Sequence, residues 1–376
     1  MKPMIYADHA ATTKLDADAF EAMKPYLLEA YGNPSQAYAF GREPKRALHR
    51  ARETIARCIH AAPEEIFFTS GGTESDNWAI RGIALPDPRR TALVTSQMEH
   101  HAVLRACEAV EALGRSVAYL PVTCEGIVTP TALEAVISPS ICLVSVMLAN
   151  NEIGTIQPIQ DLCGIAHRNG SLFHTDAVQA AGHIQVDVGE LGVDLLSASA
   201  HKFNGPKGVG FLYVKKGTPL LPLLRGGAQE LGLRAGTENV AAIVGMAVAL
   251  EKSCAAIPEA NRHLTALESR LLEGLTQAGL DFRRNGGEPH LPGNVSLSFR
   301  HADGEALLHR LDLMGICVST GSACDSGSTQ VSHVLRAIGA NPDYAPGTIR
   351  ISLGRENTTE EVDRVVEALV KILRRP

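Results

Sequence analysis

The sequence lacks the features that several classes of protein require. Its eight cysteines form no C-x-x-C pair, which argues against zinc and dithiol-redox motifs, so we expect no bound metal. A formal net charge of −6 and the lack of long Lys/Arg runs argue against a nucleic-acid partner. No uninterrupted apolar stretch approaches the roughly 20 residues of a membrane helix, and residues 1–6 lack the apolar segment of a signal peptide. We therefore expect a cytoplasmic protein with no membrane partner.

What the sequence does contain is an alternation of short apolar runs with helical patterns. Its 376 residues are 45% hydrophobic, which is enough for a large core and two domains. The alternation predicts an α/β fold with a largely parallel sheet. The run Ile141–Leu148 is almost wholly apolar, as is typical of a strand buried on both faces. The other strands predicted here are Ile66–Thr69, Ala92–Thr95, Val117–Leu120, Ser171–His174, Leu195–Ala198 and Gly210–Val214, and the helical patterns include Thr73–Ala84, Ala102–Leu113 and Ile159–Arg168.

The pattern changes after residue 252 and predicts a second, smaller α+β domain. A separate amphipathic pattern over Ala260–Ala278 follows Pro258. We place the large domain at 14–255 and the small one at 256–376, with residues 1–13 packing back on the small domain. The further elements predicted in the small domain are strand Val295–Phe299, helix Gly304–Leu313, strand Ile316–Ser319, helix Gln330–Ile338, strand Thr348–Ser352 and helix Thr359–Arg374.

A glycine-rich turn follows the first predicted strand. Residues 70–75 read Ser-Gly-Gly-Thr-Glu-Ser and lead directly into a helix. Glycines let the backbone approach an anion, and a helix N-terminus presents free N–H groups and a positive dipole end. This segment therefore favours a phosphate site, although Thr73 serving as a plain helix cap is an equal alternative.

Polar side chains also follow three later strands. His100 follows the second strand and could stack on an aromatic cofactor, Asn150 and Asn151 follow Ile141–Leu148, and Asp176 ends the strand that begins at Ser171. Ligands of open parallel sheets bind beyond the carboxyl ends of the strands. Taken singly, each residue has a structural explanation as a cap, a turn or a buried salt bridge. Together they predict a ligand site at this edge.

Lys202 is the most informative single residue. It closes the stretch 197–202, Ser-Ala-Ser-Ala-His-Lys, at a strand end, and residues 203–208 then break the regular structure. A buried lysine is costly to desolvate unless it has a task, and one such task is a Schiff base with an aldehyde cofactor. Pyridoxal phosphate also needs an acid at its ring nitrogen, a flat group on its face and a phosphate cradle. Taken alone, Lys202 is better explained as a surface lysine in a loop.

Cys324 differs from the other cysteines in its surroundings. It lies in a small, polar segment, 319–328, bounded by Gly321 and Gly327, whereas most of the others lie in apolar runs. A hydrated, hinge-bounded setting favours a reactive thiol over a structural one.

The chain resembles the cysteine desulfurases of the NifS/IscS type over nearly its whole length. The resemblance implies a fold-type I pyridoxal-phosphate-dependent transferase with a large, mostly parallel-sheet domain and a smaller α+β domain, and a homodimer. The matching segments are 8–13 (DHAATT), 32–35 (GNPS), 69–77, 99–100 (EH), 150–154 (NNEIG), 174–179, 197–210, 234–239 (RAGTEN), 321–327 and 350–352 (RIS).

The resemblance implies a role for each residue around the cofactor ring. Lys202 would form the Schiff base, and Asp176 would pair with the pyridine nitrogen. His100 would stack on the ring and shuttle protons, and Gln179 would contact the ring hydroxyl.

The resemblance also implies the groups that bind the phosphate and the substrate. The phosphate contacts would be Gly72, Thr73, Ser199 and His201, together with the partner subunit's Thr237. Asn151, which also contacts the cofactor, and Arg350 would bind the substrate carboxylate, with help from Asn33.

By the same resemblance, the protein would convert L-cysteine to L-alanine and retain the sulfur as a persulfide on Cys324. The sulfur would serve an acceptor protein, such as an iron–sulfur scaffold, or tRNA thiolation. Two alternatives stay open at this point. One is a selenocysteine lyase or another pyridoxal-phosphate lyase that forms no persulfide, and the other is a non-catalytic scaffold partner.

Four positions depart from the usual pattern of this family. Ala228 and Leu231 stand where glycine and arginine are usual, which alters contacts near the loop that the partner contributes. Asp325 replaces a threonine next to Cys324, and a carboxylate there disfavours the thiolate. Trp78, the only tryptophan, stands where a smaller aliphatic residue is usual and is expected to fill the core.

Overall fold

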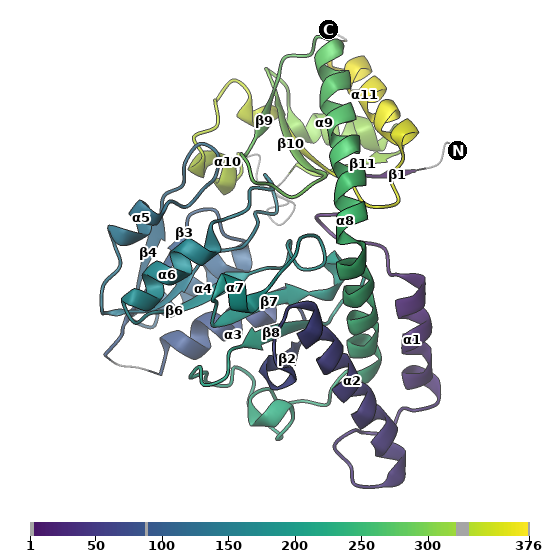
Figure 1. Cartoon of the computed structure of the whole chain (residues 1–376). Coiled ribbons are helices and arrows are strands. Elements are labelled where there is room, and N and C mark those ends of the chain that lie inside the picture. Colours follow the sequence, from purple (N-terminus) through teal and green to yellow (C-terminus); the bar gives the residue numbers. More distant parts are fainter. Residues whose placement is uncertain (1–3, 87–88, 321–330, 375–376) are drawn as a thin grey trace.

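The larger part of the protein is built on a seven-stranded sheet (Figure 1). The computed structural model describes residues 4–86, 89–320 and 331–374. The strand order is β2-β8-β7-β6-β5-β3-β4. Among the described strands of this sheet only β8 runs antiparallel to its neighbours, so the prediction of a largely parallel sheet is confirmed. The strands are Ile66–Thr69 (β2), Ala92–Ser96 (β3), Ser116–Leu120 (β4), Ile141–Ser145 (β5), Leu172–Asp176 (β6), Leu195–Ser199 (β7) and Gly210–Val214 (β8).

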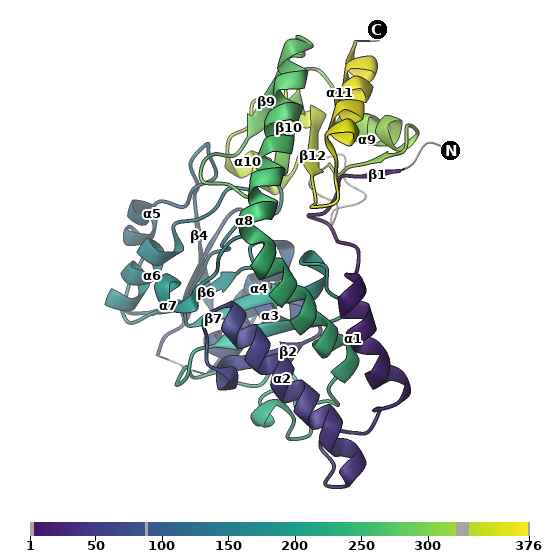
Figure 2. The ribbon, with the colours of Figure 1, turned by 45° about the vertical axis from the view of Figure 1, so that its right-hand side comes forward.

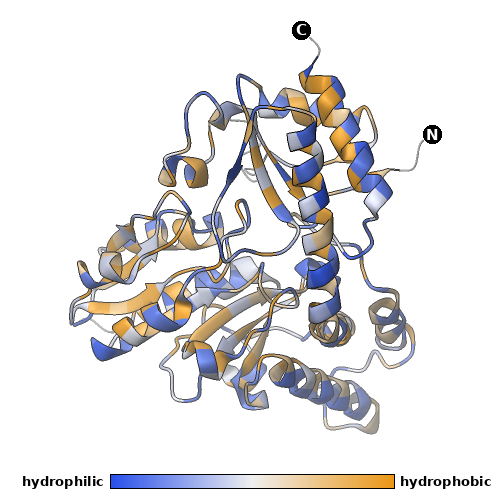
Figure 3. Ribbon diagram, turned by 45° about the horizontal axis from the view of Figure 1, so that its top comes forward, coloured by the Kyte–Doolittle hydropathy of each residue, from blue (hydrophilic) through white to orange (hydrophobic). Residues whose placement is uncertain are grey.

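Helices cover both faces of this sheet. Neighbouring residues of a strand point to opposite faces, so Leu143 packs with the cluster under α3 and α4, while Val144 packs with the cluster under α2, α6 and α8. Figure 3 shows largely hydrophobic strands, whereas the helices alternate hydrophobic and hydrophilic stretches. The helices of this part are Ala17–Leu28 (α1), Arg42–Cys58 (α2), Gly72–Ala84 (α3), His101–Glu111 (α4), Pro130–Glu134 (α5), Ile159–Arg168 (α6), Val188–Leu191 (α7) and Val240–Gln277 (α8).

A second hydrophobic core lies above the first in Figure 1. It packs against a three-stranded antiparallel sheet of order β12-β10-β9. The N-terminal strand β1 pairs in parallel with β11, which ties the start of the chain to this upper part. The elements are Ile5–Tyr6 (β1), Phe282–Asn285 (β9), Asn294–Phe299 (β10), Gly304–Asp312 (α9), Ile316–Cys317 (β11), His333–Ala337 (α10), Thr348–Ser352 (β12) and Thr359–Leu373 (α11).

The predicted interruption at Pro258 is wrong. A single helix, α8, runs from Val240 to Gln277 with Pro258 inside it, and Figure 2 shows the helix changing direction between its lower and upper halves. An internal proline removes one helical hydrogen bond and costs about 3 kcal/mol. Burial of apolar side chains at both ends of the helix offsets this cost, because Leu250 belongs to the first core and Leu271 to the second. The predicted domain boundary at 255/256 falls within this helix.

Helix α8 also has the length and composition of a membrane span, which we find for no other helix in the described ranges. However, 56% of its most apolar window is buried inside the protein. Its contribution to the two cores therefore accounts for its hydrophobic character.

Two predicted strand ends differ from the structure in a way that matters for the site. The ladder of β5 stops at Ser145, although Val146 and Leu148 still donate backbone hydrogen bonds to His174 and Asp176. Strand β6 continues to Asp176, two residues beyond the predicted end. Asp176 is therefore the last residue of a buried strand, held on a rigid element.

Trp78 fills the core, as predicted. It is 0% exposed, packs edge-on against Phe67 and donates its Nε1–H to the Leu221 carbonyl at 2.9 Å. We expect Trp78→Ala to lower the free energy of unfolding by about 3–5 kcal/mol, because it leaves a cavity and an unpaired carbonyl. Trp78→Phe should recover more than half of that loss. Chemical denaturation measures both, and a loss below about 1 kcal/mol for Trp78→Ala would contradict this role.

Candidate active site

A cavity of about 560 Å³ opens where the strands of the large sheet end. The loops after β2, β3, β6 and β7 all contribute to its lining, as expected at the carboxyl ends of parallel strands. Arg350 reaches the cavity from β12 of the three-stranded sheet, and His333 reaches it from α10. The structure thus brings together most of the residues predicted from the sequence: Gly72, Thr73, His100, Asn151, Asp176, Gln179, Ser199, His201, Lys202 and Arg350.

One end of the cavity is formed by the first turn of α3. Its leading N–H groups cannot pair within the helix and are available to an anion. Gly71 caps the helix with φ of +147°, and a Cβ at Gly72 would come within 2.6 Å of Val178 Cγ2. Glycine is therefore required for the backbone to follow this path. Ser199, the last residue of β7, lies beside both glycines.

Lys202 follows β7 in a short 3-10 turn, Ala200–Lys202. Its Nζ donates hydrogen bonds to the backbone carbonyls of Ala10 and Ala11, at 2.6 and 2.8 Å. The N-terminal segment therefore holds the amine at the cavity wall.

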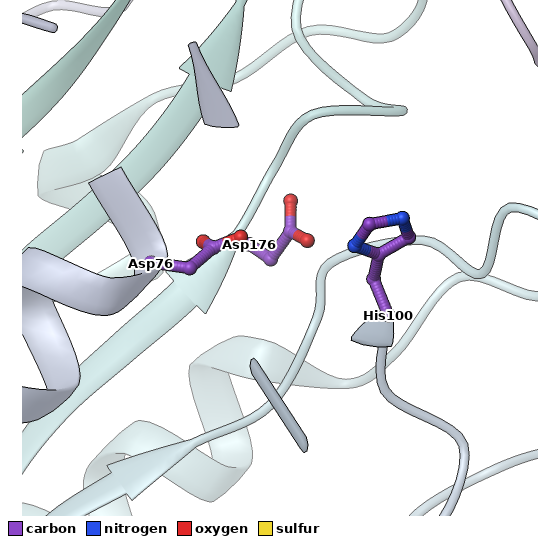
Figure 4. Close-up of side chains that lie close together, drawn as sticks. All are labelled: Asp76, His100 and Asp176. Atoms are coloured by element: carbon purple, nitrogen blue, oxygen red, sulfur yellow. The ribbon is translucent and has the colours of Figure 1, made fainter. Parts of the chain in front are cut away.

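The Asp176 carboxyl lies between Asp76 and the His100 ring in Figure 4. It accepts a hydrogen bond from the Val178 N–H at 2.8 Å. Burial raises the pKa of Asp176 to about 6, while that hydrogen bond and the charge of Lys202 act in the opposite direction. A cationic partner would therefore strongly stabilise the ionised form of this buried carboxyl.

His100 is a neutral ring at this site. It caps α4, and its Nδ1 accepts a hydrogen bond from the Ala102 N–H at 3.1 Å. Burial, followed by the charge of Lys202 and two neighbouring histidines, lowers the pKa of His100 to about 4. At neutral pH the ring offers a flat, uncharged face, with its proton on Nε2.

The other polar groups that line the cavity come from several distant segments. Arg350 is 3% exposed, and it donates to the Asn151 carbonyl and to Asp8 Oδ1, each at 2.8 Å. Its Nε–H has no hydrogen-bond partner among the described residues, which leaves a donor for a ligand. Gln179 donates to the Ala10 carbonyl at 3.0 Å. His201 contacts Thr12 Oγ1 through Nδ1 at 3.2 Å.

Two of the predicted residues, Thr237 and Asn33, are not among the described residues that line the cavity. Thr237 is exposed in the single chain, and Asn33 is half-buried with its side chain accepting the Ser35 N–H at 2.9 Å. The roles of these two residues stay predictions. Cys324 lies outside the described residues, as do Gly321, Gly327 and Asp325.

The sequence interpretation missed several residues that line the cavity, among them Ala10, Thr12, Asp76, Glu152 and His333. Most lie in matching segments quoted for the family, so the signal was present. The matching segments do not show which members of a motif face the cavity. His333 lies outside those segments and is brought in only by α10.

The donor set fits pyridoxal phosphate. The α3 turn and Ser199 would hold its phosphate, the Lys202 amine would meet its aldehyde, and the buried Asp176 carboxyl would face its ring nitrogen. Asp76, His100 and Asp176 form the one grouping of three potential metal ligands within the described ranges. Because Asp176 and His100 belong to the proposed ring contacts, we assign this grouping to the cofactor site.

Comparisons with known proteins agree with this assignment. Residues 5–365 match the Aminotransferase class-V family. The chain is 49% identical over 375 residues to "Cysteine desulfurase IscS" of Dictyoglomus turgidum, covering 99% of this chain and 95% of that protein. A solved "NIFS-LIKE PROTEIN" superposes with a TM-score of 0.93 at 41% identity and 98% and 99% coverage. A structure of "SspA in complex with cysteine" gives 0.83 at 36% identity and 94% and 100% coverage. The chain therefore belongs to the aminotransferase class-V family of pyridoxal-phosphate-dependent enzymes.

Proposed function

We propose that this protein is a cysteine desulfurase, which converts L-cysteine to L-alanine and passes the sulfur on as a persulfide formed on Cys324. The observation that carries the proposal is one cavity holding the Lys202 amine, the buried Asp176 carboxyl and the Arg350 guanidinium. Relatives named cysteine desulfurase, and the structural neighbour in complex with cysteine, favour this substrate over other amino acids.

Different residues of this chain have different roles in the proposed reaction. When bound, pyridoxal phosphate supplies an electron-withdrawing ring that weakens bonds at the substrate α-carbon. Asp176 stabilises positive charge on the ring nitrogen, and the neutral His100 packs on the ring and can accept or donate a proton. Lys202 Nζ would hold the cofactor through its aldehyde and, as a free amine, would take up the α-proton of the substrate.

Sulfur transfer falls to Cys324. Its thiolate attacks the substrate sulfur, so an S–S bond forms and the C–S bond breaks. The electron pair of the broken bond stays with the substrate carbon, which is protonated to give alanine. Since a thiolate requires reduced surroundings, we also propose that the protein works in the cytoplasm.

We also propose which kind of protein accepts the sulfur. The IscS name of the relatives supports an iron–sulfur scaffold protein as the acceptor, and tRNA thiolation is the alternative. Pull-down with a scaffold protein, followed by transfer of labelled sulfur from the enzyme, separates the two. Transfer to a tRNA-thiolation carrier alone would contradict the scaffold assignment.

We propose that the enzyme works as a homodimer. Large apolar side chains are exposed on α1 and the loop after it, and Figure 1 places α1 at the outer edge of the molecule. An apolar surface of this kind is typical of a protein interface. The exposed side chains are Phe20, Leu27, Leu28, Tyr31, Tyr38 and Phe40. Sedimentation equilibrium should report twice the chain mass of 40.0 kDa, and a monomer at micromolar concentration would contradict the proposal.

The proposed function is tested by mass spectrometry of the protein after exposure to L-cysteine. We expect one added sulfur atom on Cys324 that a thiol reductant removes, together with an equivalent amount of alanine. Alanine release without any added sulfur would instead favour a lyase. Neither product from the cofactor-loaded protein would favour the scaffold alternative.

Arg350→Ala should chiefly weaken substrate binding. Losing the two charge-assisted hydrogen bonds from the guanidinium to the substrate carboxylate should raise KM about 10- to 100-fold. Arg350→Lys should not restore KM, because an ammonium cannot reproduce the planar fork. Steady-state alanine formation measures both variants, and an unchanged KM in Arg350→Ala would contradict the role.

A further inference from the structure

Asp76 is a buried carboxyl at the cofactor site to which the proposed reaction gives no task. It projects from the second turn of α3, lines the cavity and is 1% exposed. One of its oxygens, one oxygen of Asp176 and one ring nitrogen of His100 all lie within 4.8 Å of one another. Figure 4 shows Asp76 on the side of Asp176 that faces away from His100.

No cation neutralises Asp76 within the described part of the chain. Its Oδ1 has no hydrogen-bond partner there, and the nearest basic atom in an ion-pair contact is His174 Nε2 at 3.7 Å. Both His174 nitrogens bind serines, Ser145 at 2.8 Å and Ser197 at 2.9 Å. Burial lowers the pKa of His174 to about 3, so this ring is neutral.

The other titratable groups that face Asp76 are acidic or neutral. Asp176 at the end of β6 and Glu99 before α4 are the acidic groups that raise the pKa of Asp76, while a hydrogen bond with Ser197 from β7 lowers it. Burial raises the pKa of Glu99 itself to about 8, so this carboxyl also holds a proton at neutral pH. His100 is the remaining neighbour and is neutral, as shown above. Burial, and then the charge of Asp176, raise the pKa of Asp76 well above its usual range.

Two buried carboxyls this close together cannot both ionise, so one retains a proton. Asp176 is close enough to Lys202 for that charge to favour its ionised form, whereas Asp76 lacks a corresponding cation. We propose that Asp76 is the proton-bearing member of the pair and a positioning residue, which confines the single negative charge to Asp176. This inference rests on the proposed function. A protonated Asp76 would leave Asp176 as the single carboxylate that faces the protonated ring nitrogen.

The test combines infrared spectroscopy with two variants of the holoenzyme. The wild-type protein should show the carbonyl stretch of a protonated carboxylic acid at pH 7–8, and this band should shift when aspartate is labelled with ¹³C. Asp76→Asn should remove that band, whereas Glu99→Gln should remove a separate, glutamate-derived band. The labelling experiment needs no variant and shows whether any aspartate of the folded protein is protonated, and the Asp76→Asn spectrum assigns that proton to Asp76 or to Asp176.

The variants then test positioning. Asp76→Asn keeps the size and neutrality of the side chain, so the pH titration of the bound cofactor's absorbance should superimpose on that of the wild type. Asp76→Ala leaves a buried cavity beside Asp176 and should weaken cofactor binding about tenfold, with Asp76→Asn restoring most of the affinity.

Two results would overturn the inference. One is the lack of an aspartic-acid band in the wild-type protein. The other is a shift of about one pH unit or more in the Asp76→Asn titration, which would mean that a charge had been removed. A wild-type protein that binds no pyridoxal phosphate would instead overturn the proposed function, and its infrared spectrum would still report on Asp76.

Discussion

Replacing Lys202 with alanine is expected to abolish alanine formation from L-cysteine, by about 10⁴-fold or more. The amine is positioned by the carbonyls of Ala10 and Ala11. Lys207, the other lysine among the described residues that line the cavity, lies after the 3-10 turn that carries Lys202. Since one group both joins the cofactor and moves the α-proton, its removal eliminates two steps at once.

The assay measures alanine under saturating cysteine and cofactor, and the absorbance of the bound cofactor is recorded in parallel. Lys216→Ala is the matched control, because its side chain is 80% exposed and its amine lies 3.9 Å from Glu64. It should behave as the wild type does. Alanine production by Lys202→Ala at more than a few per cent of the control would refute the assignment of the cofactor-bound lysine.

Replacing Cys324 with alanine is expected to eliminate the persulfide and to reduce alanine formation by about 10³-fold or more. Without its thiolate no group accepts the substrate sulfur, so the C–S bond is not broken productively. Binding of cysteine to the cofactor should persist, since Lys202, Asp176 and Arg350 are unchanged, and the absorbance change on adding cysteine tests this.

The Cys324→Ala variant also separates the proposed desulfurase from the alternative lyase. A selenocysteine lyase or a related enzyme would retain its turnover in this variant. Cys124→Ala is the control, because Cys124 is an exposed free thiol and lies outside the cavity lining. Full alanine release by Cys324→Ala would exclude the persulfide route.

The sequence interpretation was most successful where the signal was local. The strands Ile66–Thr69 and Gly210–Val214 and the helix Ile159–Arg168 have the predicted bounds. The polar residues at strand ends do meet in one cavity, because parallel strands bring their carboxyl ends to the same edge. Boundaries that depend on neighbours were less accurate: Pro258 was expected to separate two helices, and packing against both cores holds them as one.

The sequence by itself determined the family, the cofactor and the residue types of the site, because short ordered motifs can be recognised without knowing which residues are in contact. Only the tertiary structure decided which motif members face one another. Asp76 and Asp176 are 100 positions apart in the chain, and α3 and β6 place them together away from solvent. Their ionisation depends on that burial and proximity, and both are properties of the folded chain, not of any local segment.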